Sequence, residues 1–289
     1  MSRGVWITLG TALGVAGVGG ALLYSRRASA ASSPTPGPAP GPTPTPGPAP
    51  GPAPVIELAP LPKAAEVKGD LSTNWGETPV DLRPLLMLME ETSRIAGSAR
   101  VFAVIAYRES RFVTTAHNGN ATGEQDERDD SRAAYNNNKG RNPPLRYGEQ
   151  AADFGSGGLF GALAPYFLWT GVPEVGGKAP LLNAPPELVF QPRAAAFGAC
   201  VYMQRILKHY RVDDLADIKV GWANPSLLGS GRGGTKYHDV RARFLTDAIA
   251  LGVDLTDAST IPPKLDPSAW PGVPAVFAAL VGALPKELS

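Results

Sequence analysis

The sequence is short of cysteine and of clustered positive charge. Cys200 is the only cysteine among 289 residues, so no disulfide can form within the chain. It lies in a stretch with helical apolar spacing and has no second thiol or paired histidine, which indicates a buried core thiol rather than a reactive one. The formal net charge is only +1. We therefore expect no nucleic-acid partner, because such partners require a broad basic surface.

Patterns that bind metals or nucleotide phosphates are also missing. His117, His209 and His238 are scattered and show no ligand spacing. The glycine-rich stretch 229–234 lacks the Lys-Ser/Thr pair of a P-loop, which indicates a flexible loop instead. We expect neither a metal nor a cofactor.

Charge is absent from residues 4–24, a run of 21 positions that is long enough to cross a bilayer as a helix. A secretory signal peptide is the alternative, because Ala28-Ser29-Ala30 resembles a cleavage site. The length of the run, and Arg26 and Arg27 before that site, favour an anchor. Residues 1–33 are therefore predicted to be a transmembrane anchor or a signal segment.

A proline-rich linker is predicted at residues 34–62. Every second residue from Pro34 to Pro54 is proline, which removes backbone donors and excludes helix and sheet. The pattern favours a polyproline II spacer with a reach of up to roughly 65 Å. A disordered tail is the alternative, and either would separate the anchor from the folded region.

The remaining chain predicts a mainly α fold with long irregular loops. Helical patterns cover 81–97, 98–110, 192–210 and 235–252, with Ser98 expected to cap the second, whereas 113–157 suggests a loop with a short hairpin at most. We assign 63–258 to the main folded domain and 259–289 to a C-terminal extension. Its apolar stretch 275–284 is too short to span a bilayer and predicts a short helix packed on the domain, or one that docks a partner.

Glu109 is the candidate catalytic residue. At 100° per residue it shares one face of its helix with Phe102 and Ile105, close to the helix C-terminus. Partial burial and the negative end of the helix dipole both disfavour a charged carboxylate there, so the pattern predicts a side chain that can act as a general acid. The alternative is a structural ion pair with a nearby arginine.

Three motifs resemble the lytic transglycosylases and goose-type lysozymes. "ESRF" (109–112) resembles their Glu-Ser-x-Phe helix end, and "GSGGLFGALAPYF" (155–167) resembles their Gly-x-x-Gly-Leu-(Met/Phe)-Gln element and the proline after it. Residues 220–244 resemble a degraded form of the Ala-Tyr-Asn-Ala-Gly element and the following helix. The resemblance covers roughly residues 80–250 and implies a lysozyme-like helical catalytic domain.

The resemblance implies a reaction as well. Glu109 would protonate the bond between N-acetylmuramic acid and N-acetylglucosamine, and would then take the proton of the muramoyl C6 hydroxyl to give a 1,6-anhydro product. Hydrolysis by water would instead call for a second carboxylate. The acidic stretch 123–130 offers candidates, although a solvated loop is the favoured interpretation: Glu124, Asp126, Glu127, Asp129 and Asp130.

Residues expected to contact the glycan lie in the same motifs: Ser110, Gly158, Leu159, Phe160, Trp222, Asn224 and Tyr237. By resemblance Ser110 lies near the acetamido group, but it could equally satisfy the helix end. Trp222 would supply an aromatic surface and Asn224 an amide, whereas Tyr237 either lines the cleft or packs in the core. Gly161 stands where the family commonly has Gln.

These features predict a wall-cleaving enzyme in the bacterial cell envelope, acting on peptidoglycan glycan strands. It would be anchored in the inner membrane or exported, and would serve envelope remodelling, a secretion or conjugation apparatus, or phage entry. A non-catalytic wall-binding or assembly protein on the same scaffold is the alternative, motivated by Gly161 and the altered Asn element. A structural component of a virion or secretion apparatus is a third possibility.

Overall fold

The computed structural model describes residues 58, 60–71, 75–118, 125–140, 145–170, 184–253, 255 and 272–282. The predicted anchor and most of the predicted proline-rich linker lie outside these residues. No helix within the described ranges has the length and apolar character needed to cross a membrane.

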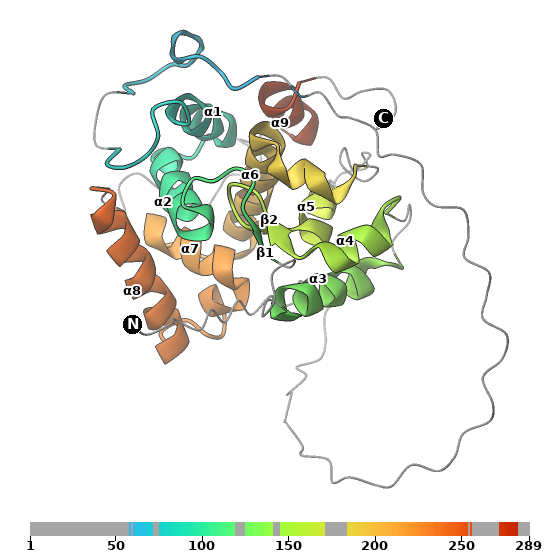
Figure 1. The fold of residues 1–289 in the computed structure, drawn as a ribbon. Helices are drawn as coiled ribbons and strands as arrows, with labels where there is room; N and C mark the ends of the chain where they lie inside the picture. The colour runs from blue at the N-terminus through green and yellow to red at the C-terminus, as the bar shows by residue number, and fades with distance from the viewer. Residues whose placement is uncertain are drawn as a thin grey trace, which may run out of the picture. The chain divides into compact units, whose positions relative to one another are not determined.

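The described part of the chain is mainly α-helical, as the sequence predicts (Figure 1). Three short strands and three 3-10 helices (η) accompany the α-helices. In chain order the elements are η1 (Ala64–Glu66), α1 (Arg83–Ser93), α2 (Ser98–Ser110), β1 (His117–Asn118), α3 (Gln125–Asn138), α4 (Gly148–Phe154), β2 (Ser156–Gly157), β3 (Ala162–Leu163), α5 (Ala164–Thr170), η2 (Pro186–Phe190), α6 (Pro192–His209), α7 (Leu215–Ala223), η3 (Pro225–Leu228), α8 (Thr235–Ala250) and α9 (Val273–Leu280).

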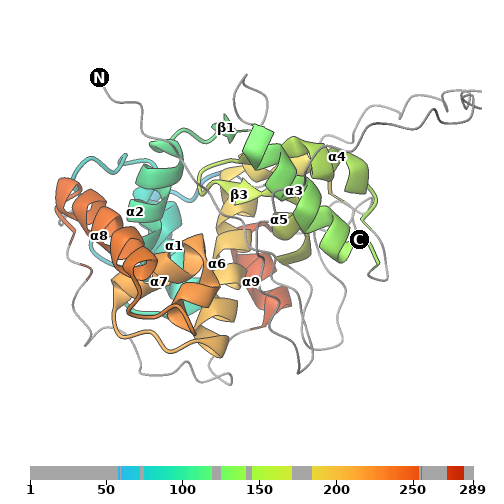
Figure 2. The ribbon, with the colours of Figure 1, turned by 90° about the horizontal axis from the view of Figure 1, so that it is seen from below.

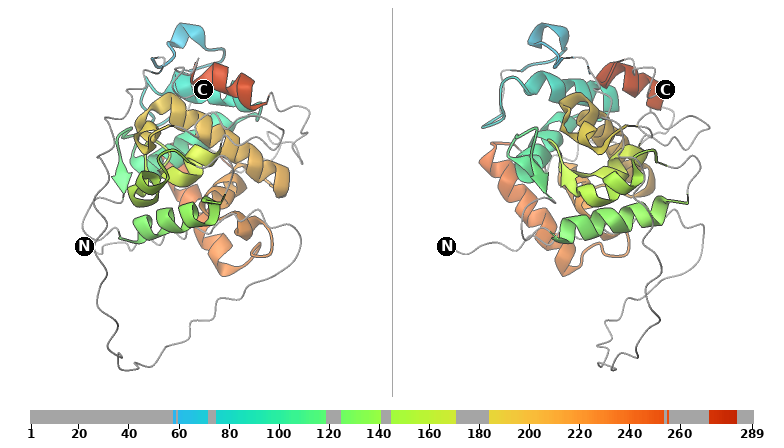
Figure 3. Two further views of the ribbon diagram at one scale, coloured as in Figure 1. Left: turned by 90° about the vertical axis from the view of Figure 1, so that its right-hand side faces the viewer. Right: turned by 45° about the vertical axis from the view of Figure 1, so that its right-hand side comes forward.

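Helix α6 is the element around which the core is built. It contacts α1, α5, α7 and α9, and the views in Figures 1 and 3 show it among these helices. Gly198 allows α6 to approach α5 closely, because a Cβ at this position would lie 2.6 Å from the ring of Phe167 on α5. Cys200 is fully buried on α6, beside the backbone of Met89 on α1. The prediction of a core thiol is confirmed.

The junction between α1 and α2 differs from the prediction. Helix α1 ends at Ser93, and Arg94 then adopts a left-handed conformation, so the helix is shorter than predicted. Gly97, not Ser98, is the N-cap residue of α2. The carboxylate of Glu90 accepts a hydrogen bond from the backbone N–H of Ala99 at 2.9 Å. A side chain from the preceding helix thus satisfies a donor that a local cap normally satisfies.

The predicted loop at 113–157 was wrong, because it contains α3, α4 and two strands. The stretch that forms α3 is too polar to show an apolar stripe. Its contact with α4 depends on small buried residues, including Ser131, whose hydroxyl donates to the carbonyl of Ala151 at 2.7 Å. Figure 2 shows α3 beside α4. The acidic stretch therefore belongs to a helix from Gln125 onward.

The strands form an antiparallel sheet in the order β1-β2-β3. His117 is opposite Gly157 in one pair, and Ser156 is opposite Leu163 in the other. The turn between β2 and β3 consists of residues 158–161, which belong to the second family-like motif. The sheet therefore presents this turn close to where the chain leaves α2.

Helix α9 is a short helix packed on α1 and α6, as predicted for the C-terminal extension. Val276 and Leu280 are fully buried. Arg193, in the first turn of α6, donates to the carbonyl of Leu280 at 3.3 Å and to that of Pro60 at 2.5 Å. This side chain joins α9 and the first described residues to the central helix.

Candidate active site

Glu109 lies in the last turn of α2, next to an abrupt change in chain direction. Arg111 and Phe112 follow with φ angles of 53° and 64°. Successive non-glycine residues in the left-handed region are uncommon and strained. The N–H of Arg111 donates to the carbonyl of Tyr107 at 3.1 Å, which satisfies the helix end. The turn fixes where the chain leaves the helix directly after Glu109.

Ser110 joins the first two family-like motifs. Its buried hydroxyl lies 2.9 Å from the carbonyl oxygen of Ala106 and 2.8 Å from that of Leu159. The single hydroxyl proton can be donated to only one of them at a time. The first bond belongs to the helix end, whereas the second connects α2 to the turn between β2 and β3. Ser110 therefore holds this turn against the end of α2.

Two glycines bring the backbone of that turn close to its neighbours. Gly158 has a φ of +74°, and a Cβ there would lie 1.9 Å from the carbonyl oxygen of Val189. Gly161 has a φ of +59°, and its Cβ would lie 2.9 Å from the Cβ of Glu109 and 3.1 Å from Oε2. A side chain at position 161 would therefore meet Glu109, because the main chain passes directly against the Glu109 side chain.

Leu159 and Phe160 are core residues, each about 1% exposed. The ring of Phe160 packs edge-on against those of Phe102 on α2, at 5.8 Å, and Trp222 on α7, at 6.5 Å. Trp222 is partly exposed and also contacts the ring of Tyr202. Of Leu159, Phe160 and Trp222, which were predicted to contact the glycan, Trp222 is the one with a partly exposed side chain.

Lys219 on α7 forms an ion pair with Oε1 of Glu109. Its side chain is 5% exposed, whereas that of Glu109 is 26% exposed. The structural alternative predicted for Glu109 is thus present, but with a lysine instead of an arginine. Sequence reasoning missed Lys219, and its one signal is a single charge in the otherwise apolar stretch "IKVGWA".

The two arginines beside Glu109 have other partners. Arg108 forms an ion pair with Asp247 on α8 at 2.7 Å. The guanidinium of Arg111 lies 4.0 Å from the centre of the Tyr107 ring on its own helix. The Arg108 contact anchors the end of α2 to α8, and Arg111 covers the Tyr107 ring. Neither arginine supplies the positive charge at Glu109, which comes from Lys219.

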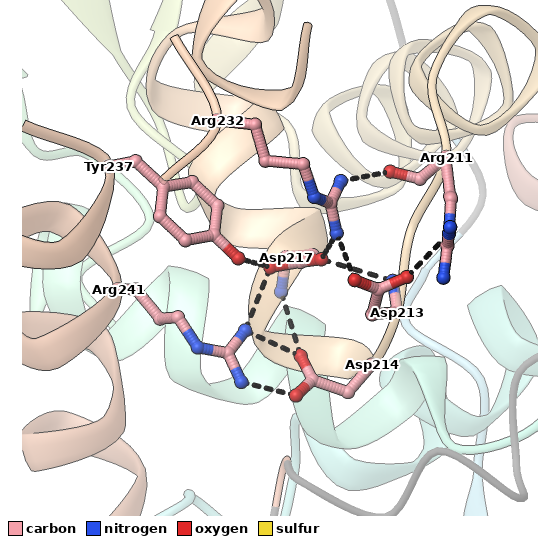
Figure 4. A network of polar contacts seen from close by, with 7 residues as sticks. All are labelled: Arg211, Asp213, Asp214, Asp217, Arg232, Tyr237 and Arg241. Atoms are coloured by element: carbon pink, nitrogen blue, oxygen red, sulfur yellow. Dashed lines mark hydrogen bonds and ion pairs between the residues drawn. The ribbon is translucent and has the colours of Figure 1, made fainter. Parts of the chain in front are cut away.

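Tyr237 belongs to a polar network between α7 and α8 (Figure 4). Its hydroxyl donates to the fully buried Asp217 at 2.6 Å, and Arg232 and Arg241 contact the same carboxylate at 2.6 and 2.8 Å. Burial, followed by this hydrogen bond, raises the pKa of Tyr237. Asp217 and Lys219 project about 200° apart on α7. The network therefore lies on the side of α7 opposite Glu109. Of the two predicted roles, Tyr237 packs in the core and does not line a cleft at Glu109. Its other members are Arg211, Asp213 and Asp214.

Asn224 has a structural role at the end of α7. Its side-chain oxygen accepts hydrogen bonds from the N–H of Ser226 at 3.1 Å and from its hydroxyl at 2.7 Å. It is thus the N-cap of η3, and it is 7% exposed. This cap accounts for the amide oxygen that the resemblance assigned to the glycan.

The structure offers no metal-binding group of three or more His, Cys, Asp or Glu side chains among the described residues. Comparisons with protein-family models, curated proteins and solved structures found no match to this chain. The candidate site therefore rests on its own geometry. Glu109 is contacted by the β2–β3 turn on one side and by α7 on the other, so segments from three separate parts of the sequence meet at one carboxylate.

Proposed function

We propose that the protein is a peptidoglycan lytic transglycosylase on a lysozyme-like domain, with Glu109 as its general acid and base. The observation that carries this proposal is the convergence of the three family-like segments on Glu109. Ser110 bonds to the carbonyl of Leu159, Gly161 lies against the Glu109 side chain, and α7 supplies Lys219. A motif resemblance without functional meaning would not require these segments to meet at the acid.

In the proposed reaction, Glu109 protonates the glycosidic oxygen between N-acetylmuramic acid and N-acetylglucosamine. The substrate's acetamido group stabilises the positive charge that develops at C1. The ionised Glu109 then removes the proton of the C6 hydroxyl, which closes on C1 to form the 1,6-anhydro ring. Acid–base transfer of this kind contributes about 10²–10⁴-fold. The partly exposed carboxyl and the nearby surface of Trp222 are consistent with access by a sugar chain.

We also propose that the chain acts in the bacterial cell envelope, with peptidoglycan glycan strands as its partner. The uncharged stretch 4–24 and the proline-rich linker support an inner-membrane anchor or an export signal that holds the domain in the wall space. A secretion or conjugation apparatus, or a phage virion, would make use of the same arrangement.

A non-catalytic wall-binding or assembly role is the second candidate, and two observations favour it. The carboxylate of Glu109 is held in an ion pair, and the side-chain oxygen of Asn224 is occupied by a helix cap. A scaffold that binds glycan without cleaving it would keep these structural contacts and have no need of a protonated acid.

The deciding experiment compares full-length protein in detergent with its Glu109→Gln variant on purified peptidoglycan. Glu91→Gln is the matched control, because Glu91 is exposed on α1. We expect anhydro-ended fragments by mass spectrometry from the wild type and the control, and a loss of about 10²-fold or more from Glu109→Gln. Reducing-end fragments would show hydrolysis instead and direct attention to the acidic residues of α3. Wall binding without fragments would support the scaffold.

A further inference from the structure

Lys219 is buried, and an ammonium group is stable in a buried position only when an opposite charge or hydrogen bonds compensate for the lost water. Its neighbours in the sequence, Ile218 and Val220, are fully buried, and its own side chain is almost completely covered. A buried charge destabilises a protein unless it is paired. Glu109 provides the pairing, from a residue 110 positions earlier in the chain. Helix α7 thus delivers one positive charge to the proposed acid.

Other ionisable groups around Glu109 are directed elsewhere. On α2, Arg108 contacts Asp247 of α8, and Arg111 lies over the Tyr107 ring. On α7, Asp217 projects to the opposite side and is paired in the α8 network. The turn at 158–163 has no ionisable side chain. Among the described residues, the cation that contacts the Glu109 carboxylate is therefore Lys219.

The two oxygens of Glu109 have different surroundings. Oε1 faces Lys219, whereas Oε2 lies beside the backbone of Gly161. A carboxyl group held at one oxygen cannot rotate freely, so the other oxygen keeps a fixed direction. Orientation of this kind matters for catalysis, because a displacement of about 1 Å can reduce a rate by about 10²-fold.

We propose that Lys219 is the positioning residue of the acid: it fixes the Glu109 carboxyl through Oε1 and thereby sets the direction of Oε2. This inference rests on the proposed function. Without Lys219 the Glu109 carboxyl could rotate, and Oε2 would lose its fixed direction. Removal of Lys219 should therefore slow turnover more than it weakens glycan binding.

The test measures kcat and KM on soluble glycan strands, for the wild type, Lys219→Met and Lys219→Arg. In Lys219→Met we expect kcat to fall by about 10²-fold with little change in KM, because the carboxyl is misdirected while the glycan contacts remain. Lys219→Arg should recover much of the kcat, because it keeps the positive charge at Oε1. Lys236→Met, an exposed lysine on α8, is the control and should change neither quantity.

A second measurement tests the ion pair without relying on catalysis. Thermal unfolding of Glu109→Gln, Lys219→Met and the double variant forms a double-mutant cycle. If the two side chains interact, the double variant loses less stability than the sum of the losses in the two single variants. Additive losses would overturn the inference. So would an active wild type whose kcat is unchanged in a folded Lys219→Met protein. An inactive wild type with a coupled cycle would instead overturn the proposed function, and the catalytic role of Lys219 with it.

Discussion

Three charged side chains occupy the end of α2, and each makes a different contact. Arg108 connects the helix to α8, Arg111 covers Tyr107, and Glu109 turns to α7. The sequence identified Glu109 because its helical position is visible in the order of residues. It could not identify Lys219, because a single lysine in an apolar stretch does not show which distant carboxylate will face it. That information is present only after α2 and α7 pack together.

At the residue scale, Gly161→Ala should destabilise the protein by more than its backbone strain. A positive φ alone costs a non-glycine residue about 1–3 kcal/mol. Gly252 provides the control, since it has a φ of +67° and a Cβ there would meet no described atom within 4 Å, whereas the Cβ of Gly161 would meet Glu109. Urea unfolding should show a larger loss for Gly161→Ala than for Gly252→Ala. Equal losses would contradict the close approach to Glu109.

At the scale of elements, the helices that could be predicted from the sequence are those with an amphipathic pattern. Helices α2, α6 and α8 have apolar faces that the sequence displays, and they were predicted within a few residues of their observed bounds. Helix α3 was missed because its residues are polar and its packing depends on Ser131 and Ala134. The resemblance found the segments that reach the site, but it could not show that Ser110 and Asn224 make their hydrogen bonds within the protein itself.

Asp217 is the fully buried carboxylate at the contact between α7 and α8. We expect Asp217→Asn to lower the free energy of unfolding by about 1.5–3 kcal/mol, because its hydrogen bonds with two arginines lose their charged acceptor. Arg232 and Arg241 are partly exposed and keep Asp213 and Asp214 as partners. Asp213→Asn is the comparison and should have a much smaller effect, since its side chain is 48% exposed. Chemical denaturation of both variants tests this difference. Similar losses would show that the network stabilises the helices through exposed rather than buried pairs.

The same network gives a pH dependence. Burial by itself would raise the pKa of Asp213, but the hydrogen bonds and charges of Arg232 and Arg211 outweigh it and lower the pKa. A carboxyl with a depressed pKa contributes stability above its unfolded value of about 3.9, and that contribution is lost as the pH falls through the folded value. Unfolding measured from pH 6 to pH 2 should therefore lose less stability in Asp213→Asn than in the wild type. A parallel loss in both would contradict this role.

At the scale of the whole molecule, Cys200 reports on the integrity of the core. It is fully buried on α6, and burial raises the pKa of its thiol. A thiol reagent should therefore react only with unfolded molecules, a fraction of about 10⁻³–10⁻⁶ under native conditions. Labelling followed by mass spectrometry should be correspondingly slow in buffer and rapid in urea. Rapid labelling of the native protein would mean that α6 opens locally.

Arg193 adds a side-chain connection between the start of the described region and its central helix. Its guanidinium contacts the backbone at Pro60, where the chain enters the described region, and at Leu280, at the end of α9. Tension at Pro60 would therefore pass partly through this hydrogen bond to the first turn of α6, as well as along the backbone. Glu109 lies at the end of a different helix and is joined to the β2–β3 turn and α7. A domain held on a tether could be pulled at this arginine while the acid kept its orientation.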